Sequence, residues 1–96
     1  MNNAINKATA CIEAIEKMAE KMNADDVEDE FAYDFIFGMW SKRLEPTLES
    51  IGINHSWYDP DTTYKEDVNT FVGSLEEVKE KLVAVKETLD NSNWTW

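Results

Sequence analysis

The side chains best suited to chemistry in this sequence are carboxylates, and half of them fall in two short stretches. The chain has 96 residues and a formal net charge of −11. Residues 25–34 contain six acids and no base, and residues 56–67 contain four acids and one lysine. The candidate contact residues are the acids of these stretches: Asp25, Asp26, Glu28, Asp29, Glu30, Asp34, Asp59, Asp61, Glu66 and Asp67.

Two interpretations of this acid are open. Carboxylates at a helix start complement the positive end of the helix dipole and often form only a solvated face. Alternatively, the acids form a binding surface. Such a surface disfavours direct contact with nucleic acid or an anionic membrane, because both are negatively charged, and it favours a basic partner. One or two acids suffice for a dipole, so six within ten residues, which repel one another, are more than the first interpretation requires.

Residues for catalysis or metal binding are sparse. His55 is the only histidine, and one imidazole beside Asp59 and Asp61 is a poor zinc site. Asp59-x-Asp61 begins like a calcium loop, but Tyr64 and Thr70 stand where that loop needs Gly and Glu. We expect no enzymatic activity, no metal and no cofactor.

Apolar residues recur at steps of three and four, which is the spacing of one helix face. The pattern predicts helices over about 3–22, 26–51 and 63–90, packed as an all-α, antiparallel three-helix bundle in a single domain, 1–96. The three apolar faces are Ile5, Ala8, Ile12, Ile15, Ala19 and Met22; Tyr33, Phe37, Trp40, Leu44, Leu48 and Ile51; and Val68, Phe71, Leu75, Val78, Leu82, Val85 and Leu89.

The middle helix is the most ambiguous element. Pro46 predicts a kink or short break over 43–45, because proline disrupts a helix interior. Aromatic residues alternate over 31–39, which is also compatible with a strand, although no second strand is evident. Asn23 is expected to end the first helix in the left-handed conformation, and Gly52 to end the second. In an antiparallel bundle the two acidic stretches would then lie at opposite ends.

A second apolar face on the middle helix consists of Phe31, Phe35 and Met39. It indicates either a fully buried helix or an oligomer interface, where aromatic residues and Met are enriched. Trp57 and Tyr58 are further candidate anchors, since Trp and Tyr are common binding hot spots. A chain this short is only modestly stable alone, so we expect a homo-oligomer, most simply a dimer.

The remaining signals concern location. The first residues lack the charged and apolar regions of a signal peptide, and no segment is apolar enough to span a membrane. The lone Cys11 lies on an apolar helix face, where a buried side chain is expected. We expect a cytoplasmic protein, in the host cytosol if it is phage-encoded.

The segment Asp34-Phe-Ile-Phe-Gly-Met-Trp-Ser41, followed by Pro60-Asp61-Thr62 and Asp67-Val68, resembles the middle of the Ocr family of phage anti-restriction proteins. The resemblance implies an acidic, helical, dimeric DNA mimic that blocks restriction enzymes. It covers only part of the chain, requires a gap, and carries over no site residue. This sequence also lacks the family's acidic tail and ends in Asn93-Trp94-Thr95-Trp96.

Together these observations predict an acidic helical inhibitor that binds a basic nucleic-acid-binding protein, of anti-restriction or anti-CRISPR type. The alternatives are a self-assembling helical adaptor or structural module, and a small-ligand sponge formed at an oligomer interface.

Overall fold

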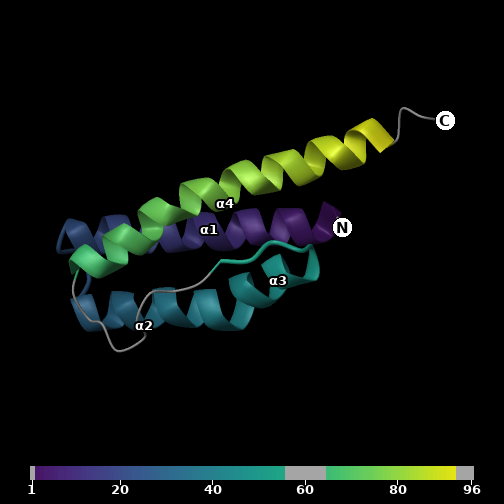
Figure 1. Ribbon diagram of the computed structural model, residues 1–96. Coiled ribbons are helices and arrows are strands. Elements are labelled where there is room, and N and C mark those ends of the chain that lie inside the picture. The colour runs from purple at the N-terminus through teal and green to yellow at the C-terminus, as the bar shows by residue number, and fades with distance from the viewer. Residues whose placement is uncertain (1, 56–64, 93–96) are drawn as a thin grey trace.

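The computed structural model describes residues 2–55 and 65–92, and these residues form a helical bundle. The elements are α1 (Asn2–Asn23), α2 (Asp29–Met39), a π-helical turn η1 (Trp40–Leu44), α3 (Glu45–Ser50) and α4 (Lys65–Ser92) (Figure 1). The predicted all-helical bundle is confirmed, and residues 31–39 are helix rather than strand. Within the described ranges, no helix is long and apolar enough to cross a membrane.

The apolar faces predicted for the first and last helices form the core. All six predicted residues of α1 are buried. On α4 the face is buried from Val68 to Leu82, whereas Val85 and Leu89 are only partly covered. Cys11 is also buried, as expected, and burial raises the pKa of its thiol. The core therefore follows α4 for about four turns and thins toward the end of that helix.

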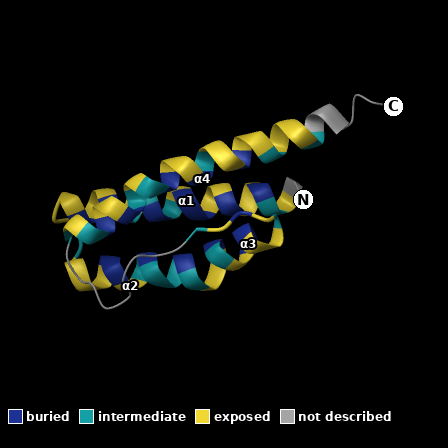
Figure 2. Cartoon of the chain, in the orientation of Figure 1, coloured by how far each residue is buried: buried dark blue, intermediate teal, exposed yellow. Residues whose placement is uncertain are grey.

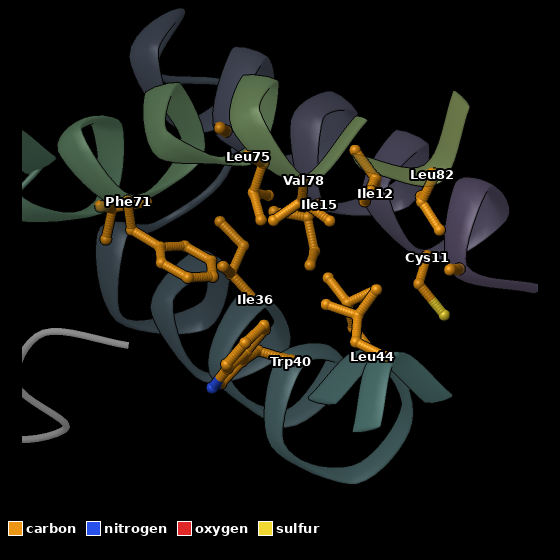
Figure 3. Close-up of a cluster of buried hydrophobic side chains, with 14 of the residues drawn as sticks. Cys11, Ile12, Ile15, Ile36, Trp40, Leu44, Phe71, Leu75, Val78 and Leu82 are labelled. Carbon is orange, nitrogen blue, oxygen red and sulfur yellow. The ribbon is translucent and has the colours of Figure 1, made fainter. Parts of the chain in front are cut away.

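The buried face of α2 is rotated relative to the prediction. Ile36 is fully buried and Phe37 is only partly buried, although Phe37 was the residue assigned to the core. The Trp40 ring continues this face and lies 5.3 Å from the Phe71 ring of α4, edge to face (Figure 3). Such aromatic pairs add about 0.5–1.5 kcal/mol beyond their buried area. Trp40, the first residue of η1, and Phe71 thus join the helical segment that continues α2 to α4 across the core.

The chain stays helical through Pro46, with one wider turn in place of the predicted break. The Glu45 N–H donates to the carbonyl of Trp40, five residues back, which is the hydrogen bond of a π-helix. A proline ring clashes with the carbonyl four residues earlier, and proline has no N–H to donate. The π-helical turn before Pro46 accommodates both constraints, so the irregularity lies where the sequence indicated.

The end of α3 confirms the predicted role of Gly52. Gly52 has a φ of 80°, in the left-handed region that favours glycine. Its N–H donates to Glu49, and the N–H of Ile53 donates to Leu48, at 3.1 and 2.9 Å. This is a Schellman ending, and it places Ile53 on the core beside Leu48.

The direction of α4 corrects one expectation. α1 runs against α2, but α4 begins beside the end of α1 and so runs in the same direction as α2 (Figure 1). The two acidic stretches were expected at opposite ends of the bundle, and this was wrong for their described residues. Lys65, at the start of α4, lies against Asp25, so both stretches meet at one end.

Candidate protein-binding surface

Eight of the ten predicted contact residues gather where α1 ends and where α2 and α4 begin, and we call this group the acidic end. All are exposed except Asp67, which is partly buried. The predicted contacts Asp59 and Asp61 lie outside the described residues. The acidic end consists of Asp25, Asp26, Glu28, Asp29, Glu30, Asp34, Glu66 and Asp67.

The turn after α1 positions the first two of these acids. Asp25 has a φ of 59°. Its N–H donates to Met22 at 3.1 Å, and the Asp26 N–H donates to Lys21 at 2.9 Å. This is again a Schellman ending, with an aspartate where glycine is usual. The prediction that Asn23 adopts the left-handed conformation was wrong, because α1 continues through Asn23 and Asp25 takes that conformation instead.

Lys65 ties the start of α4 to this turn. Its Nζ lies 2.7 Å from Asp25 Oδ1 and 3.5 Å from Asp29 Oδ1. The hydrogen bond from Lys65 lowers the pKa of the Asp25 carboxyl, and the same bond raises the pKa of Lys65. The amides of Asn23 and Asn69 add two reciprocal hydrogen bonds of 2.8 and 2.9 Å between α1 and α4. Two carboxylates of the acidic end, those of Asp25 and Asp29, therefore have a structural role.

The helix dipoles account for several other carboxylates of the acidic end. Glu28 precedes α2 without a side-chain capping bond, Asp29 and Glu30 occupy its first turn, and Glu66 lies in the first turn of α4. Each helix N-terminus carries about half a positive charge, and the C-terminus of α1 carries the opposite. Asp34 lies beyond the first turn of α2, outside the range of this effect. The acidic end therefore has more carboxylates than are needed to complement the helix dipoles.

An exposed aromatic residue lies within the acidic end. Phe31 is 58% exposed, between Glu30 and Asp34 in sequence. The two other residues of the predicted interface on α2, Phe35 and Met39, pack partly against the core, so that face is neither fully buried nor fully free. Trp57 and Tyr58 lie outside the described residues. Of this predicted set, Phe31 is the clearest apolar contact open to a partner.

His55 belongs to a polar contact that sequence spacing did not indicate. Its Nε2 lies 2.9 Å from Ser74 Oγ, and its ring stands 5.8 Å from Trp40 and 6.0 Å from Phe71. The Ser74 hydroxyl donates to the Phe71 carbonyl at 2.5 Å, so His55 serves as the donor to Ser74. Because that hydroxyl proton is already engaged, the pair lacks the arrangement of a nucleophile activated by a base. Its evident role is to hold residue 55 on α4.

These features define a small helical bundle with one strongly acidic end. Among the described residues, no cluster of His, Cys, Asp and Glu side chains is arranged to hold a metal ion. No family model matches the chain, and comparisons with characterised proteins and with solved structures give no match.

Proposed function

We propose that the protein inhibits a nucleic-acid-binding protein by occupying its basic groove, as a DNA mimic of anti-restriction or anti-CRISPR type. The observation that supports this most is that acids from the segment between α1 and α2, from α2 and from α4 gather at one end of the bundle. The bundle is 18 Å deep in its narrowest direction. Over that length a DNA duplex carries about 11 charges, since it has one per ~1.7 Å of axis. The acidic end has eight described carboxylates and one lysine, Lys65, so its net charge of −7 is about two thirds of that number.

The proposed mechanism is electrostatic capture followed by apolar contact. A dense acidic surface speeds encounter with a basic groove, and the attraction weakens as salt rises. Phe31 then offers an exposed aromatic side chain between two of these acids in sequence, Glu30 and Asp34, and aromatic side chains are common binding hot spots. The fold supplies rigidity, because Lys65 and the Asn23–Asn69 pair fix α4 against the turn after α1.

The test is whether DNA and the protein compete for the same partner. The full chain is immobilised and exposed to nuclease-treated host lysate at about 50 mM and about 200 mM salt, a range over which DNA-type contacts weaken strongly. Bound proteins are eluted with duplex DNA and identified. The proposal expects nucleic-acid-binding proteins that DNA displaces and that the higher salt releases.

Matched variants connect the result to the acidic end. Asp26→Lys with Asp34→Lys reverses two acids that make no ion pair among the described residues. It should weaken binding at least about tenfold and lower the salt slope by about one per charge removed. Glu45→Lys with Glu49→Lys changes the net charge equally, on α3, and should have a much smaller effect. Equal losses from both pairs would contradict a localised surface, and loss from neither would contradict the mechanism.

A further inference from the structure

We draw no further inference here: the strongest candidate, the partly exposed outer face of α2 that carries Phe31, Phe35 and Met39 (Figure 2), is an unpartnered apolar face, and nothing in the structure shows what covers it.

Discussion

Lys65 donates a 2.7 Å hydrogen bond to Asp25, which joins the first residue of α4 to the turn that ends α1. The two residues are 40 positions apart in sequence, and their contact shows that α4 begins beside the end of α1. It also means that one of the most exposed acids of the molecule takes part in the fold. Changes at the acidic end must therefore be separated into effects on structure and effects on binding.

The first prediction concerns the titration of Asp25. Lys65→Met should raise the pKa of the Asp25 carboxyl toward its ordinary value of 3.8, whereas Lys65→Arg should keep it low. Carboxyl titration by NMR measures this directly. Because the folded-state pKa is the lower one, the pair stabilises the fold above about pH 3.8, and the benefit disappears as the pH falls through the folded-state value. An unchanged titration in Lys65→Met would contradict the assignment.

The second prediction tests the left-handed conformation of Asp25. Asp25→Gly removes the steric penalty at a φ of 59° but also removes the ion pair with Lys65. At about 1 M salt the Debye length is only about 3 Å, so the ion pair contributes little. Asp25→Gly should then raise the midpoint of thermal unfolding. Asp26→Gly should lower the midpoint of thermal unfolding. Asp26 has no positive φ, so glycine relieves no strain there, and its greater conformational freedom stabilises the unfolded chain.

A third prediction compares two glycines. An added Cβ would meet nothing within 4 Å at either Gly52 or Gly73, so packing does not distinguish them. Gly52→Ala should destabilise the fold by about 1–2 kcal/mol, because alanine at a φ of 80° is strained. Gly73→Ala lies within α4 and should stabilise it by about 0.5–1 kcal/mol. Urea unfolding gives both values, and effects of the same sign would show that one backbone conformation is misassigned.

The fourth prediction concerns pH and His55. Burial lowers the pKa of His55 below 6.5, Glu77 opposes the shift and Lys81 adds to it. The unfolded chain therefore binds the proton more readily than the folded chain. The contribution of neutral His55 to the stability of the fold is complete above pH 6.5. It is lost as the pH falls through the pKa of His55 in the unfolded chain and then through its lower pKa in the folded chain. Urea unfolding at about pH 7.5 and about pH 5.5 should show this loss. In His55→Gln the part of the slope due to His55 should be absent.

The sequence predicted the cores of α1 and α4 because each presents a single apolar stripe. Every step from Ile5 to Met22 repeats close to one helical turn, and the structure buries each of those side chains. The middle helix has apolar side chains on several faces, so its pattern could not select Ile36 over Phe37. Pro46 and Gly52 were informative because their backbone constraints are local.

The sequence predicted which residues form the candidate site, but it did not predict how they are arranged in space. The acids were evident from composition, whereas the end at which α4 begins depends on contacts between distant residues. Lys65 carries no signal in the sequence that connects it with Asp25. His55 and Ser74, 19 residues apart, likewise follow no periodic pattern. Such pairings come from packing, which a single sequence does not encode by spacing.

The parallel course of α2 and α4 also has a kinetic consequence. Five residues separate α1 from α2, so that pair can form early from local contacts. The contact of Asn69 with Asn23 spans 46 positions and must form across a much larger chain loop. We expect the hairpin of α1 and α2 to assemble first and to expose an apolar surface that includes Ile36 and Trp40 until α4 docks. Docking of α4, which brings Phe71 against Trp40, would then be the step that commits the chain to its native state.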